Sequence, residues 1–174
     1  MRSEVESKKN TCDTGDSVLD MDLRVRVMDF LSDCAHSIDD DRLEEWPNFF
    51  SERGIYHITT KENEEAGLPI GIMYCEGRGM LKDRINALRT ANVFEPHTYC
   101  HLLGNTRLSY KSHDTLSART NFSVIRTMQS GKTENFAIGK YIDEIKFDQK
   151  IIEFTLRRVV LESRRVNVLL VLPL

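Results

Sequence analysis

The apolar positions near the N-terminus follow the period of an α-helix. From residue 19 onward they recur at steps of three and four, which predicts an amphipathic helix with one buried face. Ser17 and Asp20 form a capping-box pattern that marks where this helix begins. The predicted buried face consists of Leu19, Leu23, Val27, Phe30, Leu31, Cys34 and Ile38.

Two further helices are predicted before residue 91. In "DDDRLEEWPNFF", Asp41 and Glu44 repeat the capping-box spacing and indicate a short second helix. Pro47 disfavours helical geometry at Trp46, so a kink or an early stop is expected there. The short helix would bury Leu43, Trp46 and Phe50, and the later helix Leu81, Ile85 and Leu88.

The period changes to two in the C-terminal half of the chain, which is typical of β-strands. Residues 97–110, 115–129, 133–147 and 151–161 are predicted to form four long strands joined by short polar turns. Two shorter β-type runs, "GIYHITTKEN" and "PIGIMYCEG", precede them around a polar loop, Glu62 to Gly67. Strands well beyond the usual length of about 5 to 6 residues must twist and coil. Gly104 and Gly139 are the expected bulge points.

Helices followed by long strands predict an α+β fold. The N-terminal helices would pack on a strongly curved, mostly antiparallel sheet and form a cone-like α+β barrel. Residues 1–17 are polar and aperiodic and are expected to be a flexible arm. Residues 18–174 are expected to be a single domain, because their number suits one hydrophobic core.

Composition narrows the class of protein. Apolar residues make up 40% of the chain and charged residues 29%, which is typical of a globular protein. The net charge of −3 argues against nucleic acid as a partner. No apolar run approaches the roughly 20 residues of a membrane span, so no membrane is expected as a partner. The N-terminus has no apolar signal-peptide core and the four cysteines form no C-x-x-C pair, so a cytoplasmic location with reduced thiols is expected.

The stretch "EPHTYCHLLGN" places His97, Cys100 and His101 close together and suggests a metal site. The alternation of residues favours a strand, on which the Cα atoms of His97 and His101 would lie roughly 13 Å apart. Cys100 would face the opposite side of the sheet. We therefore expect no metal to be bound by these residues.

Two other motifs are incomplete. Cys34 and His36 match the first half of a Rieske ligand pattern, but the second half, C-x-x-H, is missing after Cys75. On a helix Cys34 and His36 would also lie about 200° apart. Gly77 and Gly79 precede a helix, but no G-K-[ST] follows them, so a turn is expected rather than a phosphate site.

A general acid/base set is conceivable inside the cone, because a histidine beside a carboxylate can transfer protons. Such a set would support a second interpretation, a stand-alone dehydratase, isomerase or cyclase that uses a His/Asp pair. A third is a small-ligand binding module without chemistry. The candidate residues are His36, Asp40, Tyr56, His57 and Asp143.

The chain ends in "LESRRVNVLLVLPL", a largely apolar segment that must pack against something. It is either a last strand that closes the sheet or a surface for subunit assembly, and both can hold. The candidate subunit interface is formed by Leu169, Leu170, Leu172 and Leu174.

Several of these stretches together resemble the small (β) subunit of aromatic-ring-hydroxylating, Rieske-type dioxygenases. The resemblance covers about residues 20 to 174 and points in particular to subunits of benzoate-, anthranilate- or salicylate-type oxygenases. It rests on the order and spacing of "DDDRLEEWPNFF", "GIYHITT", "HLLGNTRL", "FSVIRT" and "RRVNVLLVLPL".

The resemblance implies the cone fold of the nuclear transport factor two-like group, also seen in scytalone dehydratase. It implies a larger α subunit as partner, usually three α with three β. That α subunit would carry the Rieske 2Fe-2S cluster and a mononuclear iron. Electrons would come from NADH through a separate reductase. The chain itself would hold no cofactor, metal or catalytic residue and would support the α subunit.

Overall fold

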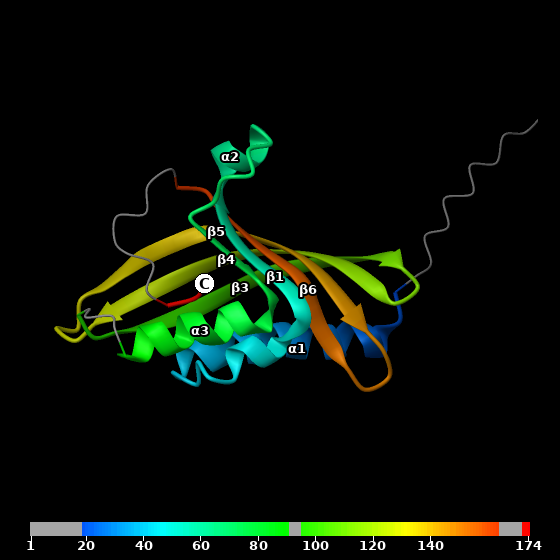
Figure 1. Ribbon diagram of the computed structural model, residues 1–174, viewed down its shortest axis with the longest axis horizontal. Helices are drawn as coiled ribbons and strands as arrows, with labels where there is room; N and C mark the ends of the chain where they lie inside the picture. The colour runs from blue at the N-terminus through cyan, green and yellow to red at the C-terminus, as the bar shows by residue number, and fades with distance from the viewer. Residues whose placement is uncertain (1–18, 91–94, 164–171) are drawn as a thin grey trace, which may run out of the picture.

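The computed structural model describes residues 19–90, 95–163 and 172–174. The predicted arm at residues 1–17, including Ser17, lies outside the described residues, as do Leu169 and Leu170. The helices are α1 (Met21–Asp39), the 3-10 helix η1 (Trp46–Phe49), α2 (Lys61–Glu65) and α3 (Gly77–Thr90) (Figure 1). The strands are β1 (Phe50–Thr60), β2 (Met73–Glu76), β3 (His97–Ser112), β4 (Thr115–Met128), β5 (Thr133–Phe147) and β6 (Ile152–Leu161).

The six strands form one sheet in the order β2-β1-β6-β5-β4-β3. All neighbouring strands are antiparallel except β1 and β6, which are parallel. The prediction of an α+β fold with a curved, mostly antiparallel sheet is confirmed. The barrel is open, because β2 and β3 remain the two edges of the sheet.

Helices α1 and α3 lie on the same side of the curved sheet (Figure 1). Asp20 caps α1, since its carboxylate accepts a hydrogen bond from the backbone N–H of Asp22 at 3.4 Å. The predicted stripe of α1 is confirmed, with Leu19 and Phe30 partly buried at its margin. The stripe of α3, Leu81, Ile85 and Leu88, is buried as predicted.

The predicted short helix around Trp46 differs in type and length from the one in the structure. A 3-10 helix occupies Trp46–Phe49, with Pro47 in its first turn, and Phe50 already begins β1. Proline suits that position because its fixed φ matches the start of a helix and its missing N–H needs no partner. Asp41 and Glu44 form no capping box. Asp41 has a positive φ of 57°, and both carboxylates bind Arg89.

The expected polar loop after the first short strand contains a helix instead. Thr60 ends β1 and its hydroxyl accepts a hydrogen bond from the backbone N–H of Asn63, which caps α2. Glu62 and Glu64 in the first turn are favoured by the helix dipole. No helix in the described part of the chain is long and apolar enough to cross a membrane.

Only one of the two expected bulge points is a bulge. The register of β3 against β4 shifts between Leu103 and Thr106, which includes Gly104. Gly139, however, pairs regularly with Phe122 and Leu161. A Cβ at Gly139 would lie 2.3 Å from the backbone oxygen of Val160, so glycine is needed there for the close approach of β5 and β6.

Candidate functional site

The interior of the cone is occupied by an ion pair between neighbouring strands. Asp143 on β5 pairs in register with Arg157 on β6, and both are almost fully buried. The guanidinium donates from Nε to Oδ1 at 3.1 Å and from Nη2 to Oδ2 at 2.9 Å. This is the bidentate geometry that gives arginine–carboxylate pairs their strength and direction.

Aromatic rings and a thiol enclose the guanidinium. Its carbon lies 4.4 Å from the ring centroid of Tyr141 and 4.0 Å from that of Phe154, within cation–π range. Arg157 Nη1 also donates to the Sγ of Cys34 at 3.4 Å. Burial raises the pKa of the Cys34 thiol to about 11, against the opposing effect of Arg157. Cys34 is therefore a protonated thiol at neutral pH, unsuited to nucleophilic attack.

Asp143 and Arg157 do not form an acid/base pair. Burial raises the pKa of Asp143, while the charge and hydrogen bonds of Arg157 oppose that shift. Both carboxylate oxygens are bound by a guanidinium, which cannot release a proton in a protein. Asp143 therefore holds Arg157 in place and has no proton-transfer partner among its hydrogen bonds.

The structure does not assemble the candidate acid/base set. His36 and Asp40 are exposed at the end of α1, where Asp40 binds Arg42 at 3.3 Å. His57 follows Tyr56 on β1 and therefore faces the other side of the sheet, where its ring contacts that of Tyr74. Burial lowers the pKa of His57. Among the described residues, no side-chain hydrogen bond or ion pair joins two members of the set.

The opening stretch of β3 is a strand, as predicted. Cys100 is exposed, whereas the side chain of His101 faces inward and is only 1% exposed. His101 is held by Asp39 at the end of α1. Its Nδ1 lies 2.6 Å from Oδ1, and its backbone N–H donates to Oδ2 at 2.8 Å. Within residues 19–90, 95–163 and 172–174, no three His, Cys, Asp or Glu side chains are arranged to hold a metal.

Sequence reasoning missed two carboxylate pairs. Asp39 and His101 are 62 residues apart, and Asp143 and Arg157 are 14 apart. Only an accurate strand register could have indicated the second pair, since it joins opposite residues of β5 and β6. Of the incomplete motifs, Cys34 is buried and His36 is exposed on α1. The expected turn at Gly77 and Gly79 is wrong, because both residues lie in α3, which begins at Gly77, where φ is 83°.

Residues 172–174, at the end of the chain, pack on the core. Leu172 and Leu174 are 8% and 1% exposed and belong to the core of this same chain. The hydroxyl of Tyr56 accepts a hydrogen bond from the N–H of Leu174 at 2.9 Å and donates to its carbonyl at 3.0 Å. Leu172 and Leu174 therefore belong to the core of this chain and are not accessible on its surface, and residues 172–174 are not part of a strand.

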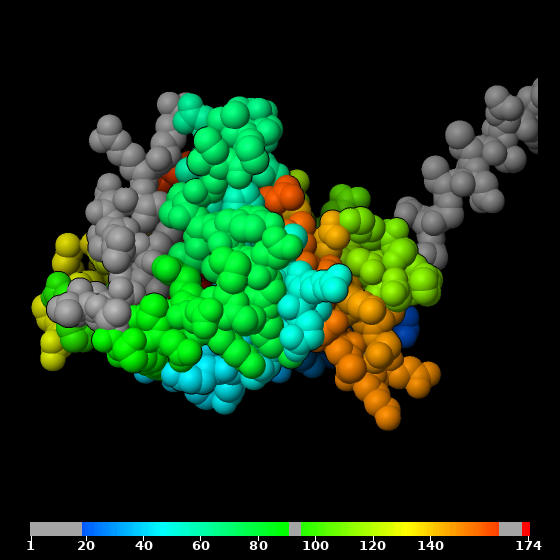
Figure 2. Space-filling view, in the orientation of Figure 1, coloured from blue at the N-terminus to red at the C-terminus, as the bar shows by residue number. Residues whose placement is uncertain are grey.

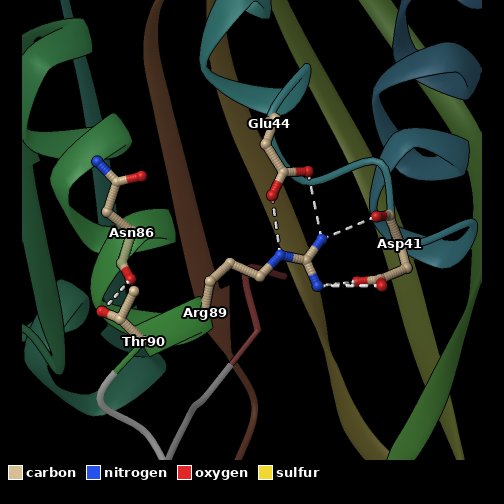
Figure 3. A network of polar contacts seen from close by, with 5 residues as sticks. All are labelled: Asp41, Glu44, Asn86, Arg89 and Thr90. Atoms are coloured by element: carbon tan, nitrogen blue, oxygen red, sulfur yellow. Dashed lines mark hydrogen bonds and ion pairs between the residues drawn. The ribbon is translucent and has the colours of Figure 1, made fainter.

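A second polar cluster joins α3 to the corner after α1 (Figure 3). Arg89 donates to Oδ1 of Asp41 at 2.8 Å and, through Nε, to Oε1 of Glu44 at 2.8 Å. Its hydrogen bond to Glu44 lowers the pKa of that carboxyl. This cluster, which we call the Arg89 clamp, borders a cavity of about 370 Å³ that is also lined by Asp39, Tyr99 and Leu172. The positive charge of Arg89 is already matched by two carboxylates, so the clamp serves to hold the helices together.

These features define a cone with an open sheet, whose interior beside β5 and β6 is filled by its own side chains and which keeps a cavity beside Asp39 and Tyr99. The chain belongs to the family of ring hydroxylating beta subunits, whose family model matches residues 34–168. It is 35% identical over 137 residues to the anthranilate 1,2-dioxygenase small subunit of Burkholderia cepacia, covering 79% of this chain and 85% of that protein. It is 37% identical over 150 residues to a terephthalate 1,2-dioxygenase beta subunit of Comamonas sp., covering 86% and 97%.

Solved structures agree with this family. A crystal structure assigned to the beta subunit of an aromatic-ring-hydroxylating dioxygenase from Novosphingobium aromaticivorans superposes with a TM-score of 0.80 at 33% identity, covering 87% of this chain and 97% of that one. The benzoate 1,2-dioxygenase beta subunit of Burkholderia mallei has a TM-score of 0.66 at 17% identity, covering 82% and 91%, and shares the fold. The fold is that of the nuclear transport factor two-like group, and the resemblance found in the sequence is confirmed.

Proposed function

We propose that this chain is the non-catalytic assembly subunit of a Rieske-type oxygenase that hydroxylates an aromatic acid. Two of its relatives are named for anthranilate and terephthalate, and both of these substrates are aromatic carboxylates. The chain would act as one domain, residues 18–174, bound to a larger α subunit in the cytoplasm, where NADH is available. Three copies of each subunit would form the complex.

The family match is the observation that carries this proposal, because the family model covers residues 34–168 and the curated relatives are small or beta subunits of dioxygenases. Asp143, Arg157 and the rings of Tyr141 and Phe154 also fill the interior beside β5 and β6, where a cone-fold lyase or isomerase would need room for substrate beside a proton-transfer group. A Rieske cluster with two cysteine and two histidine ligands also finds no matching set of side chains in the described part of this chain. The cluster, the mononuclear iron and the link to NADH through a reductase would therefore belong to the partners.

Co-expression with the large oxygenase subunit encoded in the same gene cluster tests this proposal. We expect a tagged form of this chain to retain the larger subunit through affinity and size-exclusion chromatography. The large subunit should bring the C-x-H … C-x-x-H ligands into the complex. If the chain instead purifies alone with lyase or isomerase activity, the proposed function is wrong.

A further inference from the structure

An unusual run of exposed apolar side chains extends from the end of α2 to the first turn of α3. Five large apolar side chains there are exposed, within thirteen residues of sequence, and we call them the 68–80 strip. The green surface of this segment faces the viewer below α2 in Figure 2. The strip consists of Leu68, Ile70, Ile72, Tyr74 and Met80, with Ile70 the most exposed apart from Met21 among the large apolar residues, at 67%.

The strip continues an edge strand, β2, with apolar side chains that face water. Leu68, Ile70 and Ile72 lie in the irregular segment before β2, Tyr74 lies on β2 itself, and all four are exposed. Between them Gly71 and Met73 are half-buried, and Cys75 is buried. A strand at the edge of a sheet normally presents polar side chains to water. Apolar residues at every second position therefore indicate a surface that is covered in the working protein.

The strip is also held rigidly. A Cβ at Gly71 would lie 2.2 Å from His57 Nε2, so this part of the segment packs directly on β1. The N–H of Ile72 donates to the carbonyl of Ile58 at 2.7 Å. The carbonyl of Ile70 accepts from Asn63 Nδ2 at 3.1 Å. Because the segment is already ordered, a partner that covers it has little conformational entropy to remove.

The charges around the strip select the kind of partner. Glu65 and Glu76 are exposed beside it and give it an acidic rim. In a two-fold contact between copies of this chain, the same patch faces itself, so the acidic rims would meet and repel. An apolar surface flanked by basic side chains, on a different protein, would complement the strip better than a second copy of the strip would. Leu172 and Leu174, the competing candidates in the described residues, are buried.

We propose that the 68–80 strip is the docking surface for the large oxygenase subunit, which would present apolar side chains flanked by basic ones. This inference rests on the proposed function, because it takes the partner from it. It assigns the contact to the β2 edge of the sheet rather than to the outer sheet face or the C-terminal leucines.

Paired substitutions in the co-expressed complex test the assignment. Ile70→Asp/Ile72→Asp places two charges in the strip, while Leu102→Asp/Ile138→Asp changes two residues that are each 50% exposed on the outer faces of β3 and β5. We expect the first pair to reduce the large subunit recovered with the tagged chain at least tenfold. The second pair should leave recovery unchanged. Circular dichroism and urea unfolding of each isolated variant should match the wild type, since all four side chains are exposed.

The outcomes separate the two proposals. If the wild type retains the large subunit and the strip variant retains it equally well, the docking assignment is wrong and the proposed function stands. The strip variant could instead stop this chain from binding copies of itself while the large subunit stays bound. In that case the strip is a contact between copies of this chain, and the docking assignment is wrong. If the wild type itself fails to retain the large subunit, the proposed function fails.

Discussion

Replacing Arg157 by methionine is expected to lower the free energy of unfolding by about 3 to 5 kcal/mol. The substitution keeps much of the apolar stem but leaves the Asp143 carboxylate buried without its partner. It also removes the cation–π contacts with Tyr141 and Phe154. Urea unfolding followed by circular dichroism at neutral pH measures the difference.

The matched variants are Asp143→Leu and the double change Asp143→Leu/Arg157→Met. The single change at Asp143 leaves the guanidinium unpaired in the same apolar surroundings and should cost a similar amount. The double variant removes both charges, so it should be closer to the wild type than either single variant. Additive costs in the double variant would show that the two residues do not act as a buried pair.

Replacing Trp46 by alanine is expected to cost about 3 to 5 kcal/mol in the free energy of unfolding. Trp46 is fully buried, and its ring meets those of Phe50 and Tyr56 edge-on at centroid distances of 5.3 and 4.9 Å. Alanine would leave a large cavity where η1 joins β1. The same urea titration, compared with the wild type, gives the magnitude.

Trp46→Phe should cost clearly less than Trp46→Ala. Phenylalanine keeps an aromatic ring in the cluster, and the indole Nε1 that it removes has no hydrogen-bond partner among the described residues. Asn48→Ala, an exposed change in the same short helix, should stay within about 0.5 kcal/mol of the wild type. Equal costs for the alanine and phenylalanine variants at Trp46 would contradict the role assigned to ring packing.

The strands were the most predictable part of the fold. A period of two sustained over a whole strand specifies which residues face the core, and the predicted 133–147 matches β5 fully. The stripe of α1 was equally clear, since seven apolar positions share one face. In both cases the residues that the local pattern marks as core-facing are the ones that the tertiary packing buries.

Predictions failed where a distant residue decided the local structure. Asp41 and Glu44 have capping-box spacing, but Arg89, 48 and 45 residues away, binds both of their carboxylates. Gly139 is explained by the backbone of Val160 on the next strand rather than by a bulge. The sequence suggested that His36, Asp40, Tyr56, His57 and Asp143 could meet, whereas Asp143 pairs with Arg157 and Asp39 pairs with His101. Their spacing carried no information about which side chains would meet.

The most direct measurement is the iron content of the co-purified complex with His97→Ala/His101→Asn in this chain. Asparagine can retain a hydrogen bond to Asp39, so the fold of β3 should persist. If this chain contributes structure and no metal ligands, elemental analysis will find the same iron per complex as in the wild type. A proportional loss of iron from the intact complex would contradict that claim.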